Sequence, residues 1–217
     1  MKITKYPQSC LLIETKDKKI LIDPGKLKYK DEYFSIWNSV DAILITHKHP
    51  DHCNTEVLEK LDKKITIYST KEVQEANESL DINIVKDNDI LNIGDIKIEV
   101  VHAIHGYQPL LKGKEINENV GYIIDDGENR LYSTSDTICF RNDYKASILC
   151  APVTGHGLTM SAFETALYAK EVGATLTIPV HMDNPNFPPD FEYIKEMFEK
   201  YDVEYEILDN DETIEVD

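Results

Sequence analysis

Arginine is almost absent from this sequence, and positive charge is scarce throughout it. Only Arg130 and Arg141 are arginines, and 23 lysines and arginines face 40 acidic residues, for a formal net charge of −17. A field of this sign repels phosphate backbones, so nucleic acid is not expected as a partner and nuclease activity fits poorly. We interpret the charge as one that keeps a soluble protein dispersed, and we expect a small-molecule substrate. Homo-oligomerisation is left open by the sequence.

Long apolar segments and paired cysteines are also lacking. Residues 1–7 do not contain the hydrophobic stretch of a signal peptide, and no later segment approaches the roughly 20 apolar residues of a membrane span. The sequence therefore predicts no membrane span and a cytoplasmic location. The four cysteines are far apart without a C-x-x-C pair, which favours reduced thiols. Cys53 follows His52 directly, but we interpret it as a small buried hydrophobe and not as a ligand.

Low-complexity segments, internal repeats and linkers are absent as well, so residues 1–217 are expected to form a single domain. With 41% hydrophobic residues, the chain can bury a core of its own. Apolar runs of strand length alternate with helical patterns, which predicts an α/β fold. Strands are predicted at residues 11–14, 20–23, 42–46, 65–69, 90–93, 96–103, 120–124, 131–133, 148–153, 175–180 and 203–208, and helices at 55–61, 71–79, 162–171 and 191–201.

Histidine is concentrated in one short segment. The sequence THKHPDH, residues 46–52, holds three of the seven histidines and directly follows an apolar strand pattern. His47 and His49 are two apart, so in an extended segment both side chains leave on one side and can bind one metal ion. Asp51 and His52 are neighbours that diverge, and they suit a second ion. The spacing therefore predicts two metal ions held close together, as in hydrolytic two-metal sites.

Three more candidate ligands stand after other predicted strands. They are His105, Asp136 and His181, each a polar residue that follows an apolar run. Each alone fits a capping or core role as well as a ligand role, and their agreement with the cluster at His47 favours ligation. His102 is a rival to His105. We favour His105 because it stands at the end of the strand pattern, whereas His102 falls within it.

The loop of residues 155–160 is a further candidate part of the site. It precedes a helix whose Ser161 and Glu164 match the S-x-x-E capping box, and Gly173 follows that helix as a left-handed cap would. His156 stands between two glycines, where backbone freedom allows close approach to a ligand. The sequence favours neither of two interpretations of His156: a residue that contacts the substrate, or an exposed residue of a loop.

The order of these motifs resembles the metallo-β-lactamase superfamily over nearly the whole chain. The family hallmark H-x-H-x-D-H is similar to residues 47–52. The segments that end in His105, Asp136 and His181 resemble its third metal-binding motif, its bridging-aspartate motif and its last histidine motif. Asp23, at the end of an early strand, resembles an aspartate that supports the site. The last third looks most similar to the simple metal-dependent hydrolases that include the ascorbate-6-phosphate lactonase-like proteins.

The resemblance implies a fold and a ligand set. The implied fold is a four-layer αββα sandwich of two mixed β-sheets, with helices outside and the site at one edge. The implied ligands are His47, His49 and His105 for one metal ion, Asp51, His52 and His181 for the other, and Asp136 as the bridge. Ser135 departs from the family, in which glycine is common before the bridging aspartate. Zinc is the expected metal, with manganese, iron or nickel as alternatives.

The implied function is a metal-dependent hydrolase of a small ester, lactone, amide or phosphodiester. Two divalent ions lower the pKa of a shared water from about 15.7 toward about 7 and polarise the scissile group. We expect Asp51 to orient the hydroxide, and His156 to hydrogen-bond the developing oxyanion or protonate the leaving group.

Two other classes of function are weighed against the hydrolase. A di-iron redox enzyme, which reduces oxygen or nitric oxide, is disfavoured because such relatives commonly have glutamate at the place of His49 and add a flavin domain. A non-catalytic protein whose metal ions only stabilise the fold is disfavoured by a complete ligand set beside an open loop.

The identity of the substrate is left open. Tyr107, Leu110 and Leu111 follow His105 and either line an apolar wall of the pocket or pack ordinarily. The charge of −17 disfavours anionic substrates, unless metal ions and nearby lysines offset it locally; the candidates are Lys26, Lys28, Lys48 and Lys112.

Overall fold

The computed structural model describes residues 1–107 and 115–217, in which two mixed β-sheets lie face to face. The first sheet contains β1 (Lys2–Lys5), β2 (Leu11–Thr15), β3 (Lys18–Ile22), β4 (Ala42–Leu44), β5 (Thr66–Ser69), β6 (Ile82–Ile84) and β13 (Thr213–Glu215). The second sheet contains β7 (Ile90–Ile93), β8 (Ile96–His102), β9 (Val120–Asp125), β10 (Arg130–Ser133), β11 (Ile148–Pro152) and β12 (Leu176–Val180). Their strand orders are β13-β1-β2-β3-β4-β5-β6 and β12-β11-β10-β9-β8-β7.

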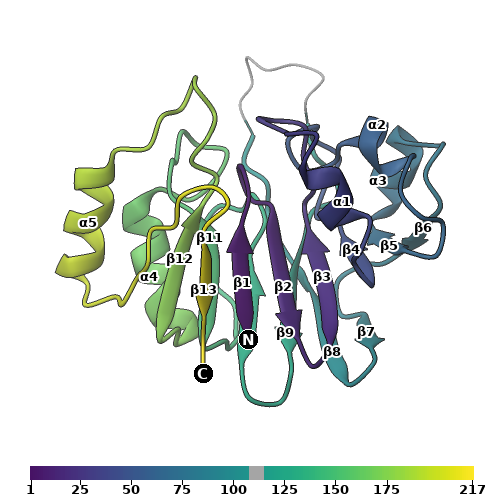
Figure 1. Ribbon diagram of the computed structural model, residues 1–217. Helices are drawn as coiled ribbons and strands as arrows, with labels where there is room; N and C mark the ends of the chain where they lie inside the picture. Colours follow the sequence, from purple (N-terminus) through teal and green to yellow (C-terminus); the bar gives the residue numbers. More distant parts are fainter. Residues whose placement is uncertain (108–114) are drawn as a thin grey trace.

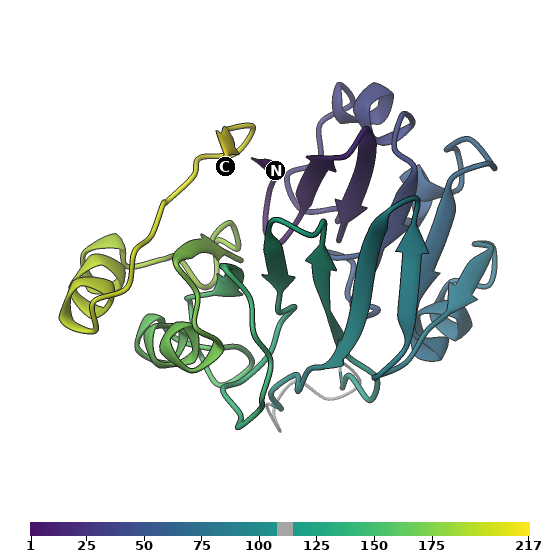
Figure 2. The ribbon, with the colours of Figure 1, turned by 90° about the horizontal axis from the view of Figure 1, so that it is seen from below.

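Helices cover the outer face of each sheet (Figures 1 and 2). The first sheet is covered by α1 (Tyr33–Trp37), α2 (Thr55–Leu58) and α3 (Lys71–Ala76), and the second by α4 (Ala162–Val172) and α5 (Phe191–Lys200). The order of layers is helix, sheet, sheet, helix, which confirms the predicted αββα sandwich. No helix in the described part of the chain is long and apolar enough to cross a membrane.

Alternation of side chains along the strands produces this layering. In β2, Leu11 and Ile13 lie in the core between the two sheets, whereas Leu12 packs on the outer side against Trp37 and the other residues under α1. Successive side chains of a strand point to opposite faces, so one apolar strand supplies two separate cores. Burial of each such aliphatic side chain contributes roughly 1.5–3 kcal/mol.

Most predicted elements are present, but the strand predicted at residues 203–208 is wrong. That segment pairs with β12 only at Tyr205, which bridges Thr177. Val203 packs in the outer core under α4 and α5, whereas Leu208 packs between the sheets. The segment therefore crosses the edge of the sandwich and cannot run along one strand. The last strand is β13, which pairs antiparallel with β1.

The carboxyl ends of many strands meet at one edge of the sandwich. β1, β3, β4 and β5 share one direction in the first sheet, as do β8, β10, β11 and β12 in the second. The two sheets are joined at this edge by a hydrogen bond in which the Val120 amide donates to the Thr46 carbonyl at 3.3 Å. The loops that follow these strands, at the upper edge in Figure 1, hold the candidate ligands.

Candidate metal centre

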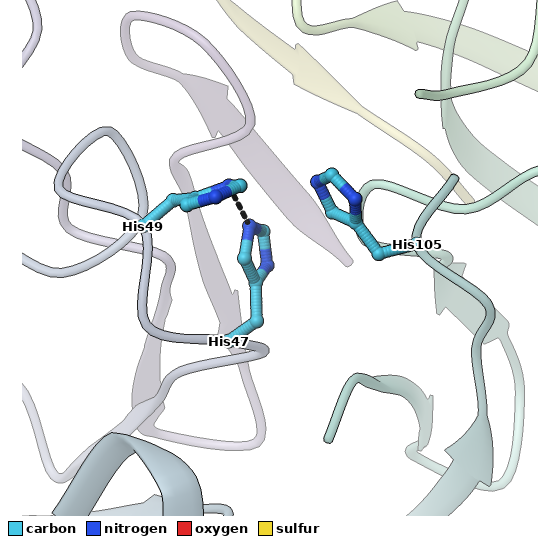
Figure 3. Close-up of side chains that lie close together, drawn as sticks. All are labelled: His47, His49 and His105. Atoms are coloured by element: carbon cyan, nitrogen blue, oxygen red, sulfur yellow. Dashed lines mark hydrogen bonds between the residues drawn. The ribbon is translucent and has the colours of Figure 1, made fainter. Parts of the chain in front are cut away.

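Three histidines point toward one another (Figure 3), and they lie in loops that follow strands of the two sheets. His47 and His49 follow β4, and His105 follows β8. The His47 Nε2 atom lies 3.1 Å from His49 Nδ1, and the ring centroid of His105 lies 5.2 Å from that of His47 and 4.9 Å from that of His49. Three imidazoles at this separation can each offer a nitrogen to one ion, as their candidate ligand atoms lie within 4.8 Å of one another.

Hydrogen bonds behind the rings determine which nitrogen faces the centre. The Nδ1 atom of His105 donates to the Gly106 carbonyl at 2.8 Å. The Thr46 hydroxyl donates to Asp23 at 2.9 Å, so it accepts from the His47 Nδ1 atom, 3.0 Å away. Because a carbonyl or an engaged hydroxyl can only accept here, the proton is on Nδ1 and the Nε2 lone pair faces the centre, where that of His47 is hydrogen-bonded to His49 Nδ1.

A second group of ligands lies next to the first. The Asp136 Oδ2 atom is 2.9 Å from His181 Nε2 and 3.2 Å from His52 Nε2. The Asp51 Oδ2 atom lies 3.7 Å from His181 Nε2 and 4.0 Å from His52 Nε2. Asp136 also forms a possible ion-binding group with His47 and His52. It therefore stands between the two sets of histidines.

Asp23 supports this arrangement from below. Its side chain has no solvent exposure and accepts hydrogen bonds from the Thr46 amide, the Thr46 hydroxyl and the His52 Nδ1 atom, all at 2.8–2.9 Å. It therefore orients His52 directly and His47 through Thr46. The supporting role implied for Asp23 by the resemblance agrees with these contacts.

Two buried polar atoms at the centre fit a metal ion. Within the described residues, Asp136 Oδ1 makes no hydrogen bond although it is shielded from solvent, and the buried His52 Nε2 faces only carboxylate oxygen, with Asp136 Oδ2 3.2 Å away. Buried polar atoms normally have a partner, because leaving one unsatisfied costs about 1–3 kcal/mol. An imidazole nitrogen and a carboxylate oxygen are common metal donors, so the residues at this centre fit divalent ions.

The pKa values of His47 and His181, which belong to different groups of candidate ligands, shift in opposite directions. Burial and the neighbouring His52 hold the pKa of His47 well below its usual value, so its imidazole is neutral. Burial acts to lower the pKa of His181 as well, but the adjacent carboxylates of Asp136 and Asp51 raise it to about 9. Asp136 has its own pKa held well below the usual range, since His181 and His52 outweigh the effect of burial. A cation that binds at His181 therefore replaces a proton.

Backbone strain is concentrated at the same place. Asp23, Ser135 and His181 adopt positive φ angles of 47°, 65° and 61°. Such conformations cost non-glycine residues about 1–3 kcal/mol each and persist where surrounding contacts hold them. The departure at Ser135 is explained by its contacts, because its hydroxyl donates to Asn119 Oδ1 at 2.7 Å and lies 3.4 Å from His47 Nδ1.

A cavity of about 470 Å³ opens over the centre. Its walls include the apolar side chains of Tyr107, Leu158 and Phe187, together with His156. The His156 ring is half-buried and stacks on Phe187 with 3.8 Å between ring centroids. Burial and the nearby His181 lower the pKa of His156. His156 is thus a wall residue of the cavity, not a fully exposed loop histidine, and Tyr107 also belongs to the wall.

Several residues considered in the sequence lie elsewhere. His102 is exposed at the end of β8, edge-on to Phe140 with 5.7 Å between centroids, which leaves His105 at the centre. Cys53 is buried in the apolar core under α1 and α2, where burial raises the pKa of its thiol to about 12, and it belongs to none of the possible ion-binding groups among the described residues. All four cysteines are free thiols.

The lysines considered as local cations are largely neutralised. Three of them form ion pairs at 2.6–2.8 Å: Lys26 with Glu56, Lys28 with Asp183, and Lys48 with Glu72. Lys112, Leu110 and Leu111 lie outside the described residues. Among the described residues that line the cavity, Lys48 is the only lysine or arginine.

Gln8 and Phe187 are among the site residues that were not predicted from the sequence. Gln8, in the turn between β1 and β2, donates to Asp51 Oδ2 at 2.9 Å, and Phe187 follows β12 after six intervening residues. Neither stands at a strand end in a polar motif, so no spacing distinguishes them. His181 directly follows β12, which indicates that the next segment lies near the cavity, and this was the only available signal for Phe187.

Known proteins resemble this chain in sequence and in fold. The sequence pattern of the family described as "Beta-lactamase superfamily domain" matches residues 2–181. The UPF0173 metal-dependent hydrolase NEQ378 of Nanoarchaeum equitans is 29% identical over 229 aligned positions, which cover 100% of both chains. The solved structure of Igni18, a metallo hydrolase from Ignicoccus hospitalis, has a TM-score of 0.79 at 22% identity and covers 98% of this chain and 97% of its own. An isothiocyanate hydrolase from Delia radicum gut bacteria has a TM-score of 0.79 at 18% identity, with 100% and 99% covered.

Proposed function

The chain belongs to the metallo-β-lactamase superfamily and is a metal-dependent hydrolase, and from this premise we propose that it uses a binuclear metal centre to hydrolyse a small, uncharged substrate. The observation that carries the proposal is the position of Asp136. Its carboxylate lies 2.9 Å from His181 and 3.2 Å from His52, and it also groups with His47. One carboxylate shared by two sets of ligands is suited to bridge two ions.

The proposed ligands follow the two groups of side chains. His47, His49 and His105 would hold one ion, Asp51, His52 and His181 the other, and Asp136 both. Zinc is the metal we propose, because imidazole nitrogens dominate the donor set and zinc accepts imidazole and carboxylate together. Manganese, iron and nickel are the alternatives that the same donors accept.

Hydrolysis at such a centre needs an activated water and a polarised bond. Two divalent ions held by these residues would supply both, by lowering the pKa of a water from about 15.7 toward about 7 and by withdrawing electrons from the scissile group. Asp51 Oδ2 accepts from Gln8, and we propose that the other carboxylate oxygen of Asp51 orients the attacking water. Asp51 would then both bind a metal ion and position the attacking water.

His156 is proposed to act on the other side of the scissile bond. Its lowered pKa favours the neutral imidazole, whose one ring N–H can donate a hydrogen bond to a developing oxyanion, whereas protonation of a leaving group would need the imidazolium form. Its place in the cavity wall brings it to the substrate. We expect His156→Gln to lower kcat by roughly 10²-fold with metal content unchanged. An unchanged kcat/KM on a confirmed substrate would remove this role.

The cavity supports an uncharged substrate with an apolar group. Tyr107, Leu158 and Phe187 line it, and the ammonium of Lys48 is 2.7 Å from the Glu72 carboxylate. A volume of about 470 Å³ lies within the roughly 300–1,000 Å³ of small-molecule sites. Esters, lactones and amides with an apolar substituent are therefore favoured over phosphodiesters. The free thiols are consistent with a reducing, cytoplasmic setting, which we include in the proposal.

The proposal is tested with metal-free protein that is reloaded in a controlled way. Chelated protein should hydrolyse none of a panel of chromogenic esters, lactones, amides and phosphodiesters, and added Zn²⁺ should restore activity toward an uncharged member. Asp136→Ala should be inactive under all loading conditions. Full activity of the chelated protein would contradict metal dependence, and redox turnover with iron in place of hydrolysis would contradict the reaction class.

A further inference from the structure

Gln8 occupies an unusual position beside the proposed metal centre. It lies in the turn between β1 and β2, its side chain has no solvent exposure, and its φ angle is 62°. A buried glutamine with a left-handed backbone carries two costs, the removal of its amide from water and the conformational strain. Specific contacts must offset both.

The hydrogen bonds of Gln8 fix the orientation of its amide. The Asp183 backbone N–H donates to Gln8 Oε1 at 2.8 Å, and Gln8 Nε2 donates to Asp51 Oδ2 at 2.9 Å. A backbone N–H can only donate and an ionised carboxylate can only accept, so the amide cannot be reversed. Asp51 therefore always receives an N–H from this side.

The backbone of Gln8 holds a second candidate ligand. Its carbonyl accepts the His181 backbone N–H at 2.9 Å. His181 itself has a positive φ of 61°. Asp51 and His181 belong to the same proposed group of ligands. Gln8 contacts two members of this group, Asp51 through its side chain and His181 through its backbone. Its contacts are thus directed at one of the two ions.

Asp183 fixes Gln8 from the far side. Its Oδ2 atom accepts the Gln8 backbone N–H at 2.8 Å, and its Oδ1 atom accepts from Lys28 and from Asn210, each at 2.8 Å. Lys5, which is 2% exposed, lies 3.6 Å from the same carboxylate. These hydrogen bonds and ion pairs hold the Asp183 carboxylate in place. Gln8 is therefore held rigidly between a charged anchor and Asp51.

We propose that Gln8 is a positioning residue for one metal ion: it aligns Asp51 through its side chain and His181 through its backbone. The inference rests on the binuclear centre proposed above. Hydrogen-bond partners of metal ligands typically change metal affinity by about 10–100-fold when they are replaced. Loss of Gln8 should therefore weaken one of two metal equivalents and leave the other almost unchanged.

Two nearly isosteric variants test the inference. Gln8→Met removes the donor to Asp51, whereas Gln8→Glu keeps an acceptor for the Asp183 N–H and places an oxygen against the Asp51 carboxylate. Gln74→Met and Gln74→Glu are the matched controls, because Gln74 is a partly buried glutamine that bonds Leu80 and Ile82 near α3, away from the centre. Metal-free proteins are titrated with Zn²⁺ by calorimetry and with Co²⁺ by visible absorption, which reports ligand geometry.

We expect two equivalents in the wild type and in the Gln74 controls. In both Gln8 variants one equivalent should bind roughly 10–100-fold more weakly, with an altered cobalt spectrum for that equivalent alone. Two unchanged equivalents in both variants would overturn the inference and leave the binuclear proposal standing. Equal weakening of both equivalents would also overturn it, since that is the result of a general loss of structure. A wild type that binds a single equivalent would contradict the binuclear proposal itself.

Discussion

Asp23 shows how one buried carboxylate can organise several ligands. It orients His52 directly and His47 through the Thr46 hydroxyl, so it acts on both proposed groups of ligands. Gln8 acts on one group only. The two residues together explain how side chains from loops far apart in sequence are oriented toward a common centre.

Replacing Asp23 by asparagine should therefore weaken metal binding. Asparagine has the same size as aspartate, but its amide NH₂ replaces one carboxylate oxygen. This donor would then face the N–H or O–H donors of Thr46 or His52, and no hydrogen bond could form there. We expect metal affinity and kcat/KM to fall by about 10–100-fold, measured by competition with a chelator and by rate assays.

Asp126 provides the control for this variant. It is also buried and accepts from three donors, Thr15 and the amides of Glu128 and Asn129, but it lies in the hairpin turn before β10. Asp126→Asn should lower the free energy of unfolding by about 1–3 kcal/mol and leave metal affinity unchanged. Equal losses of metal affinity in the two variants would show that the effect of Asp23→Asn is only a loss of stability.

The candidate ligands were predictable from the sequence because each stands in a recognisable local pattern. His47 to His52 form one dense motif, and His105, Asp136 and His181 follow apolar strands. Gln8 and Phe187 were not predictable, because their contacts join segments far apart in the chain and need no particular local spacing. The place of His156 in the cavity wall was not predictable either, because it depends on stacking against Phe187, which is a tertiary contact.

At the scale of elements, close approach between loops sets the shape of the cavity. A Cβ atom on Gly106 would lie 2.0 Å from the Gly157 carbonyl oxygen, which no real contact allows. Gly106 thus lets the loop with His105 pass directly over the loop with His156.

Gly106→Ala should push these two loops apart and displace His105. We expect a loss of at least tenfold in affinity for one metal equivalent and a larger loss of kcat/KM. Gly173→Ala is the matched control, because Gly173 caps α4 with a φ of 80° and an added Cβ meets nothing within 4 Å. That change should cost about 1 kcal/mol of unfolding free energy by chemical denaturation and leave activity unchanged. Normal metal binding by Gly106→Ala would show that the close approach of these two loops is not needed to place His105.

The predicted elements were most accurate where local signals are strong. The capping box of Ser161 and Glu164 and the left-handed Gly173 mark α4 correctly. The five-residue α1 and the short strands β1, β6 and β13 were not predicted, because so few residues show no clear period. Their positions depend on partners: β13 forms by pairing with β1, which lies about 200 residues earlier in the chain.

At the scale of the molecule, one core joins both sheets. Ile13 and Ile22 from the first sheet pack with Ile98 and Ile124 from the second. Neither sheet can keep this face buried without the other, so we propose that residues 1–217 form a single cooperative unit. The metal-free protein should unfold in one transition.

This prediction is checked with two probes in a denaturant titration. Fluorescence of Trp37, the single tryptophan, reports the outer core of the first sheet, and far-ultraviolet circular dichroism reports both sheets. We expect coincident midpoints. Midpoints that differ clearly would indicate two units that unfold separately.

The net charge of −17 should act on the encounter with substrate. For an anionic ester, kcat/KM should rise by up to roughly tenfold as salt increases from low to physiological concentration, because salt screens the repulsion. A neutral ester of the same size should show little change. The measurement is a salt series with the two esters, and a fall in kcat/KM for the anionic ester would instead reveal a local cationic site.

The binuclear centre is tested most directly by the number of metal ions bound per chain. Metal-free wild type and Asp136→Ala are loaded with Zn²⁺, freed of excess metal and measured by native mass spectrometry and elemental analysis. We predict two ions per wild-type chain and at most one tightly bound ion in Asp136→Ala, with loss of hydrolysis. One ion per wild-type chain, or two tightly bound ions in Asp136→Ala, would contradict the assignment of Asp136 as the bridge between two metals.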